Sequence, residues 1–190
     1  KWEIPTRLED QGAKIPADIW GSITEKLDEA NINITDIDGM GVGAPGFIIA
    51  ETGTVAHAVN IGWKNFELGK ELKELSGLPV FVNNDANIAA LGENWLGAGN
   101  LDENLIAITL GTGVGGGLIA NGQVISGTNG TAGEIGHVTV EPNGAPCNCG
   151  RNGCLETVTS ATGIVRQAKE VVNAGIESKL EDVFKEKGEI

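Results

Sequence analysis

Apolar residues recur three or four positions apart in several stretches of the chain, which is the spacing of one helix face. The first stretch covers residues 15–30, where the apolar positions are Ile15, Ile19, Ile23 and Leu27. The second covers residues 86–96, where they are Ile88, Leu91 and Trp95. Helices are also predicted over 159–172, with Thr159 or Ser160 as N-cap, and over 178–187.

Shorter apolar runs predict buried strands over 37–44 and 78–82 and a further strand over 104–110. Residues 114–125 contain two apolar runs joined by Asn121-Gly122. This pair tolerates the two positive φ angles of a type I′ turn, so the segment predicts a hairpin. The mixture of helices and strands indicates an α/β fold. The polar, glycine-containing stretch 96–104 is the expected domain boundary, dividing the chain into residues 1–96 and 97–190.

Composition narrows the classes of function. Lys and Arg number 13 against 26 Asp and Glu, so the net charge of −13 argues against nucleic acid binding. No apolar run reaches the roughly 18 residues of a membrane span, and the first residues are not a signal peptide. Three cysteines without a secretory signal favour metal ligation in a reducing compartment, so a cytoplasmic protein is expected. Because the chain begins without Met, we expect a fragment.

All three cysteines lie within eight residues of a loop rich in Gly and Asn. Together with one histidine they offer one nitrogen and three thiolates, a closed tetrahedral set for structural zinc: His137, Cys147, Cys149 and Cys154. The alternative is three inert buried cysteines, which do not usually concentrate in such a loop. A metal would fold a segment that has too little apolar content to fold alone.

Two carboxylates flank this cluster. A metal-bound imidazole directs its second N–H toward an acceptor. Glu134 precedes His137 by three residues, and Glu156 follows Cys154 by two. Each glutamate alone could be a solvated surface charge. Together with a rigid metal loop, they predict a receptor for hydroxyl groups.

The 29 glycines cluster at three places, which are residues 41–46, 111–117 and 127–136. The second cluster contains G-x-G-x-x-G, but a hairpin rather than a helix is predicted to follow, so we reject a dinucleotide site. A strand–turn–strand remains, in which the backbone N–H groups of Gly111, Thr112 and Gly113 could hold phosphate oxygens. The alternative is a tight turn with no ligand.

The stretch Asn83-Asn84-Asp85 ends a predicted strand and begins a predicted helix. Asp85 could be an N-cap, which typically stabilises a helix by about 1 kcal/mol. It could instead be a general base, because α/β folds gather their sites at the carboxyl ends of strands. The local pattern leaves both interpretations open.

Taken together, these motifs resemble the ROK family of sugar kinases and repressors. The resemblance rests on "NNDANIAALGE", "LGTGVGGGL", "GTAGEIGH" and "CNCGRNGCLE", in this order and spacing, and spans roughly residues 40 to 165. It implies an actin/hexokinase-like, ribonuclease H-like fold with two lobes. Residues 1–96 would then be the remainder of the small lobe, and residues 97–190 part of the large lobe. The family's amino-terminal D-x-G-x-T strand and carboxy-terminal adenosine-binding segment are expected to lie outside these 190 residues.

The resemblance also assigns roles to residues. It implies sugar binding by Asn84, Asp85, Glu134, His137, Glu156 and Gly46, the last in the "GAPG" loop. It implies a nucleotide at Gly111, Thr112 and Gly113, with Mg²⁺ accompanying ATP. It implies zinc at His137, Cys147, Cys149 and Cys154. Asp85 would be the general base that accepts the proton of the sugar's 6-hydroxyl.

Within the family, "NNDANIAALGE" and "GTAGEIGH" are most similar to the glucokinase branch, so ATP-dependent phosphorylation of glucose is the expected reaction. A fructokinase or an N-acetylmannosamine kinase is the nearest alternative. The effector domain of a sugar-sensing repressor is an alternative of another class, and a zinc-stapled interaction module without catalysis is a third. The expected partners are a hexose and ATP, in a homodimer that binds neither nucleic acid nor membrane.

Overall fold

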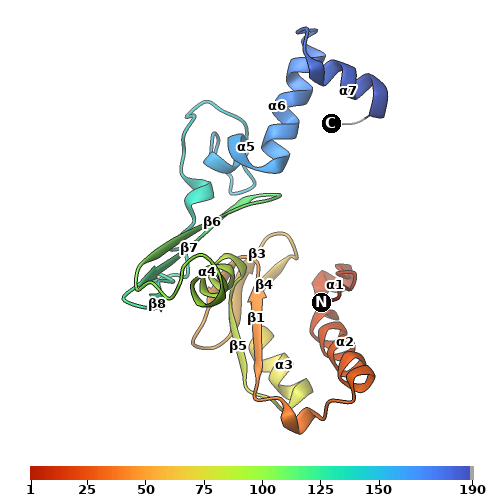
Figure 1. The fold of residues 1–190 in the computed structure, drawn as a ribbon, viewed down its shortest axis with the longest axis vertical. Helices are drawn as coiled ribbons and strands as arrows, with labels where there is room; N and C mark the ends of the chain where they lie inside the picture. Colours follow the sequence, from red (N-terminus) through yellow and green to blue (C-terminus); the bar gives the residue numbers. More distant parts are fainter. Residues whose placement is uncertain (189–190) are drawn as a thin grey trace.

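The computed structural model describes residues 1–188 as a mixed α/β structure with three small sheets (Figure 1). Near the amino terminus, a short helical turn α1 (Glu9–Gly12) is followed by helix α2 (Ile15–Ala30) and the 3₁₀ turn η1 (Ile34–Asp36). The helix predicted from apolar spacing over 15–30 is therefore confirmed. Within the described residues, no helix combines the length and apolar character needed to cross a bilayer.

The first sheet pairs β1 (Met40–Ala44) with β5 (Val80–Asn84) in parallel. The register runs from Met40 opposite Val80 to Ala44 opposite Asn84. Both strands were predicted from their apolar runs. Because the strands are parallel, the Pro-Gly turn after β1 and the Asn-Asp pair at the end of β5 lie at the same edge of the sheet.

An antiparallel sheet that the sequence did not predict connects the two parallel strands. It contains β2 (Phe47–Ile49), β3 (Thr54–Ala58) and β4 (Trp63–Phe66), and helix α3 (Leu68–Ser76) returns the chain to β5. The hydrophobic core lies where this sheet, β5, α2 and α3 meet: Ile15, Ala44, Ile48, Val55, Ala58, Trp63, Leu68, Leu72 and Val82.

Helix α4 (Asp85–Leu96) contacts β1 and β5 on one side and β6 and β7 on the other. It packs through its small residues, because a Cβ on Gly117 would lie 2.5 Å from that of Ala90. The apolar stripe that predicted this helix is not its buried face. Ile88, Leu91 and Trp95 are 37%, 38% and 70% exposed, since only small side chains fit against the glycines of β7.

The third sheet contains β6 (Leu105–Leu110), β7 (Val114–Ala120) and β8 (Gln123–Val124), all antiparallel. The predicted hairpin turn is confirmed, since Asn121 and Gly122 have φ angles of 51° and 73°. The strand–turn–strand at residues 110–114 is also confirmed, with Leu110 opposite Val114.

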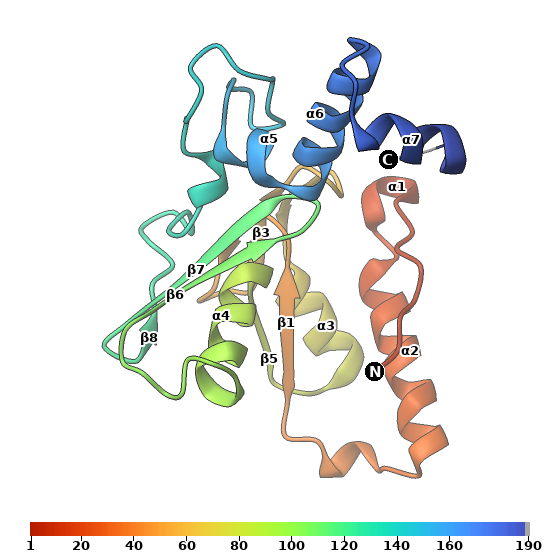
Figure 2. The same cartoon turned by 45° about the horizontal axis from the view of Figure 1, so that its top comes forward.

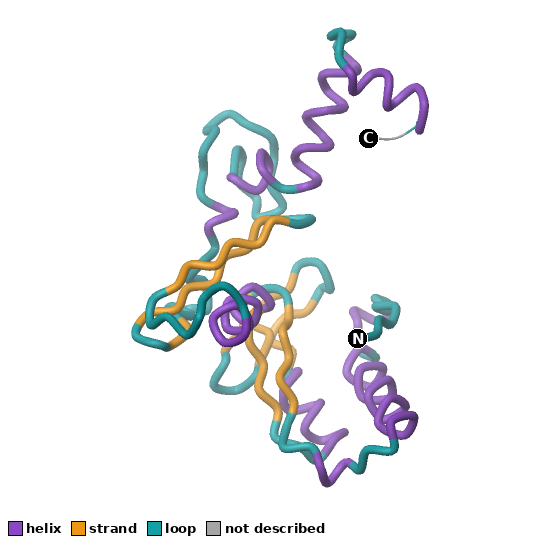
Figure 3. Tube along the Cα trace, in the orientation of Figure 1, coloured by secondary structure: helices purple, strands orange, loops and turns teal. Residues whose placement is uncertain are grey.

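The carboxy-terminal part begins with the 3₁₀ turn η2 (Ile135–His137) and a long loop, drawn in teal in Figure 3. Helices α5 (Leu155–Thr159), α6 (Ala161–Asn173) and α7 (Lys179–Lys187) follow. Figure 2 shows that this loop and α5 lie above the tip of the β6–β7 hairpin. Of the two N-caps proposed for α6, the structure selects Ser160, whose side chain accepts the N–H of Gly163.

Candidate functional site

The two residues of the Asn-Asp pair at the end of β5 have different positions at the start of α4. Asn84 is the N-cap of α4, because its Oδ1 accepts the N–H groups of Ala86 and Asn87 at 2.9 and 3.2 Å. Asp85 is the first helical residue, and among residues 1–188 its Oδ1 accepts only the neighbouring N–H of Ala86. The capping role that the sequence left open for Asp85 thus belongs to Asn84. Asp85 keeps an exposed side chain at the N-terminus of α4.

The turn after β1 is tied to this pair. The Nδ2 of Asn84 donates to the carbonyl oxygen of Gly46 at 3.1 Å. Gly46 has a φ of +92°, which a side chain tolerates poorly. A Cβ at this position would also overlap the carbonyl oxygen of His57 and lie 2.9 Å from the Cα of Ala58. The backbone at residue 46 can therefore lie this close to β3 only when the residue is glycine.

Replacing Gly46 by alanine should therefore lower the free energy of unfolding by about 2–3 kcal/mol, the sum of backbone strain and steric overlap. Gly77 is a matched control, because its φ is +73° but nothing lies within 4 Å of a Cβ built there. Gly77→Ala should cost about 1 kcal/mol through its φ angle alone. Urea denaturation followed by tryptophan fluorescence measures both. Equal losses in the two variants would contradict the proposed overlap with β3.

Residues 111–113 form the tight turn between β6 and β7. The N–H of Gly111 donates across the turn to the oxygen of Gly113 at 3.0 Å. The start of α6 also contacts the turn, since the N–H of Ala161 donates to the oxygen of Gly111 at 2.8 Å. The backbone of this glycine-rich turn is thus fixed in orientation.

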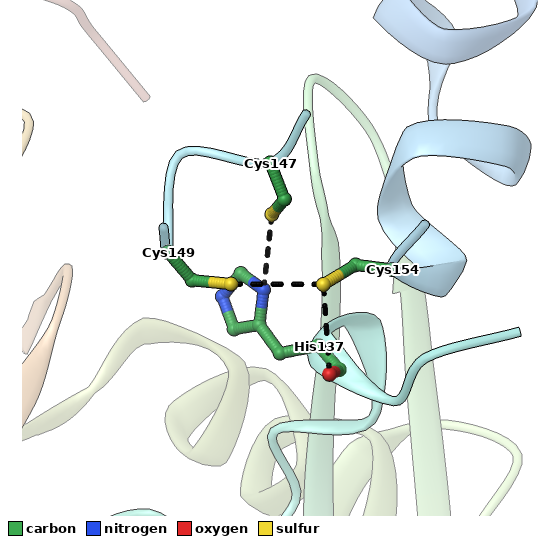
Figure 4. Close-up of side chains that lie close together, drawn as sticks. All are labelled: His137, Cys147, Cys149 and Cys154. Atoms are coloured by element: carbon green, nitrogen blue, oxygen red, sulfur yellow. Dashed lines mark hydrogen bonds between the residues drawn. The ribbon is translucent and has the colours of Figure 1, made fainter. Parts of the chain in front are cut away.

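Four potential metal ligands converge beyond this turn: His137, Cys147, Cys149 and Cys154 (Figure 4). Their ligand atoms all lie within 4.8 Å of one another. The Sγ of Cys147 lies 3.5 Å from Nδ1 of His137, and the Sγ atoms of Cys149 and Cys154 lie 3.6 Å apart. A tetrahedral zinc site requires about 3.6 Å between N and S and about 3.8 Å between two S atoms, from its bond lengths. The donor set and its spacing fit such an ion.

The pKa of one of the three thiols is lowered, and the pKa values of the other two are raised. Burial opposes ionisation of Cys149, but hydrogen bonds from Arg151 outweigh it and lower the pKa of this thiol to about 6. Burial raises the pKa of Cys147 to about 12. Metal ligation requires thiolates, and a bound cation supplies the charge that stabilises them together.

His137 connects the metal cluster to a carboxylate. Its Nδ1 faces Cys147, while its Nε2 lies 3.8 Å from Oε2 of Glu134. Burial is the main cause that raises the pKa of Glu134 above its usual value. The proximity of His137 opposes this shift, and the negative charges of Asp85 and Glu156 add to it. The three carboxylates are therefore close enough to interact electrostatically.

Glu156 joins the metal loop to the glycine turn. It lies in α5, two residues after Cys154, and its Oε2 accepts the N–H of Val114 at 3.0 Å. A Cβ on Gly113 would overlap the same oxygen. One carboxylate oxygen of Glu156 thus supports the start of β7, and the other lies 3.9 Å from Sγ of Cys147.

A cavity of about 1170 Å³ brings together residues from all of these segments. It is lined by the predicted sugar and nucleotide residues: Gly46, Asn84, Asp85, Gly111, Thr112, Gly113, Glu134, His137 and Glu156. Cys149 also reaches this cavity. Residues that the sequence did not single out line it too, including His57, Asn60, Thr131 and Arg151. The one sequence signal that could have indicated their role in the cavity is their position next to strand ends or next to metal ligands.

The chemistry of this cavity combines three functions. Carboxylates and an imidazole can pair with several hydroxyl groups. Asp85 can accept a proton at the edge of the sheet. A backbone turn with N–H groups can bind an anion.

The ROK family model matches residues 7–189 of the chain. A glucokinase from Halalkalibacterium halodurans is 57% identical over 181 residues, which are 95% of this chain and 55% of that protein. The chain spans about half the length of the curated relatives it matches.

Two solved structures superpose well on the chain. A ROK family transcriptional regulator, described as a homologue of the Escherichia coli MLC protein, has a TM-score of 0.78 at 34% identity, covering 89% of this chain and 43% of that one. A ROK family glucokinase from Streptomyces griseus, in complex with glucose and AMPPNP, has a TM-score of 0.74 at 36% identity, covering 91% of this chain and 53% of that one. These superpositions confirm the predicted hexokinase-like α/β fold class.

Proposed function

Because the chain belongs to the ROK family, we propose that it carries the sugar site and the phosphate turn of an ATP-dependent glucokinase. The observation that supports the proposal is the shared cavity, which Asp85 lines together with Glu134, His137, Glu156 and the glycine turn. A kinase must bring an acceptor hydroxyl and a phosphoryl group to the same place, because phosphoryl transfer depends mainly on positioning and charge stabilisation.

In the proposed reaction, the carboxylate of Asp85 accepts the proton of the glucose 6-hydroxyl. The 6-oxygen forms a bond to the γ-phosphorus, and the bond from that phosphorus to the bridging oxygen breaks, so ADP leaves with the electron pair. Mg²⁺ bound with ATP would offset the phosphate charge in a cavity that already holds three carboxylates. The N–H groups of Thr112 and Gly113 would contribute further stabilisation at the phosphates, whereas the N–H of Gly111 already donates to the oxygen of Gly113.

The sugar would be recognised mainly from the metal side of the cavity. Glu134, His137 and Glu156 offer acceptors and a donor for its hydroxyl groups, and Asn84 and Gly46 complete the other side. A sugar with a missing or inverted hydroxyl leaves one of these polar groups unpaired, which is the physical basis of selectivity.

We further propose that the four-residue cluster holds structural Zn²⁺. All four protein ligands are supplied by the chain, which leaves no open position for a catalytic role. Zinc at Nδ1 of His137 would fix the imidazole with Nε2 directed toward Glu134.

The three free thiols are best preserved in a reducing compartment, so we propose a cytoplasmic protein. We also propose a homodimer, which sedimentation analysis would test.

The decisive test measures ATP-dependent phosphorylation of five sugars by the protein at its full natural length. The sugars are glucose, mannose, fructose, N-acetylglucosamine and N-acetylmannosamine. We expect glucose to have the highest kcat/KM. A higher kcat/KM for fructose or N-acetylmannosamine would make that sugar the preferred substrate, while phosphoryl transfer from ATP would remain the reaction.

The ROK regulator that superposes at a TM-score of 0.78 makes a sugar-sensing repressor the second candidate. A sensor would bind sugar without transferring phosphate. Calorimetric sugar binding by zinc-loaded protein that phosphorylates none of the five sugars would favour this second function. Absence of sugar binding as well would favour an interaction module without catalysis.

A further inference from the structure

The glycine turn is held from behind by the first residues of α6. The N–H of Ala161 donates to the oxygen of Gly111 at 2.8 Å, and the hydroxyl of Thr162 donates to the oxygen of Thr112, also at 2.8 Å. Two successive carbonyl groups of the turn therefore point toward α6. This contact joins residues 50 positions apart in the chain.

The direction of these carbonyl groups fixes the direction of the next two N–H groups. In a trans peptide, C=O and N–H point to opposite sides. The N–H groups of Thr112 and Gly113 therefore point away from α6, toward the cavity that these residues line. Within residues 1–188, neither N–H donates to a protein acceptor. Two adjacent free N–H groups on one side of a turn are suited to binding an anionic oxygen.

The hydroxyl of Thr162 is itself oriented by a short hydrogen-bond relay. The N–H of Gly163 donates to Oγ of Ser160 at 3.0 Å, and that oxygen lies 3.0 Å from Oγ1 of Thr162. Because a carbonyl oxygen can only accept, Thr162 must give its proton to Thr112. Ser160 must then donate its own proton to Thr162. Ser160 is 1% exposed, so solvent does not compete for its hydroxyl.

We propose that Thr162 is a positioning residue for phosphoryl transfer, because its hydroxyl aims the N–H groups of Thr112 and Gly113 at the phosphates of ATP. The inference rests on the proposed kinase function. Thr162 contacts the far side of the turn and acts through the backbone. Its removal should therefore alter the handling of ATP and leave the sugar site unchanged.

The test compares Thr162→Val with Thr162→Ser in the protein at its full natural length. Valine keeps the β-branched shape but removes the hydroxyl, and serine keeps the hydroxyl. We expect kcat/KM for ATP to fall at least about tenfold in Thr162→Val, since small displacements of reacting groups are costly. KM for glucose should stay within about twofold, and Thr162→Ser should retain most of the wild-type kcat/KM.

Thr159→Val is the matched control, because the hydroxyl of Thr159 donates to the oxygen of Leu155 within α5 and not to the turn. It should leave kcat/KM for ATP unchanged. The inference is overturned if Thr162→Val keeps wild-type kcat/KM for ATP, if Thr162→Ser loses as much as Thr162→Val, or if Thr159→Val shows the same loss.

Equilibrium binding separates this inference from the proposed function. If the wild type phosphorylates none of the five sugars, the kinase proposal fails, and calorimetry with AMPPNP and Mg²⁺ still tests Thr162. Weaker binding by Thr162→Val than by Thr159→Val would support its role in orienting the turn. Equal binding, or no binding by the wild type, would overturn it.

Discussion

Replacing Asp85 by asparagine should lower kcat for glucose phosphorylation by about 10²- to 10⁴-fold, the usual contribution of a positioned base. Asparagine retains an oxygen that can accept the N–H of Ala86, so the start of α4 should stay intact. It cannot accept the proton of the 6-hydroxyl. The Kd for glucose should stay within several-fold of wild type, because amide and carboxylate have similar size and both accept hydrogen bonds.

Asp102→Asn is the matched control, because Asp102 lies in the loop between α4 and β6 and does not line the cavity. Initial rates and calorimetric glucose binding should be measured on both variants. If Asp85→Asn loses glucose affinity by the same factor as its rate, Asp85 contributes to binding and is not the base. A normal rate in Asp85→Asn would remove it from the mechanism altogether.

Loss of the metal should have the second largest effect, because the 16 residues between His137 and Cys154 form no helix or strand. The segment 138–153 is held by the isolated bridges Pro146–Asn152 and Thr139–Cys154 and by backbone hydrogen bonds of turns, such as those from Cys147 to Arg151 and from Gly153 to Ala145. Cys154 is 0% exposed and anchors the end of this segment. Structural zinc contributes about 10–16 kcal/mol of apparent binding free energy in small zinc domains, so its loss should unfold this loop.

Cys154→Ser should therefore abolish stoichiometric zinc, lower the Tm and expose 138–153 to proteolysis. Asn148→Ser is the matched control, because this loop residue lies between two ligands without being one of them. Zinc content by atomic emission and mapping of protease cleavage sites measure the two outcomes. One zinc per chain and a wild-type cleavage pattern in Cys154→Ser would show that the cluster is not a structural metal site.

The sequence predicted most of the site because its chemistry is concentrated in short motifs. The four metal ligands lie within 18 residues, and their spacing alone indicated that they meet. It also predicted α2, α4, the hairpin and the parallel strands, whose apolar patterns are regular. The roles assigned to individual site residues remain predictions until the variants are measured.

Strands β2, β3 and β4 were not predicted because their patterns are short and irregular. These strands are three to five residues long and do not alternate cleanly between apolar and polar positions. His57 and Asn60 were not predicted as site residues, because their place at the cavity depends on this unpredicted sheet. Helix α3 was not predicted either, although Leu68, Leu72 and Leu75 have the i, i+4, i+7 spacing of a helix face.

Two further details required tertiary information. Asn84 and Asp85 are both good N-caps, and only the geometry of α4 distinguishes them. The buried face of α4 could not be chosen from its own sequence, because the more apolar face is the exposed one. The choice depends on Gly115 and Gly117 in a strand that comes later in the chain.

The close approach of Glu156 to Gly113 has an evolutionary consequence. A Cβ on residue 113 would overlap the carboxylate oxygen that holds Val114, so a side chain at 113 requires the carboxylate of Glu156 to move and release that N–H. These two positions, 43 apart in the sequence, should therefore covary among homologues. A homologue with a larger residue at the first position is expected to carry a shorter one at the second. Frequent pairing of glutamate with a larger residue would show that the two sites drift independently.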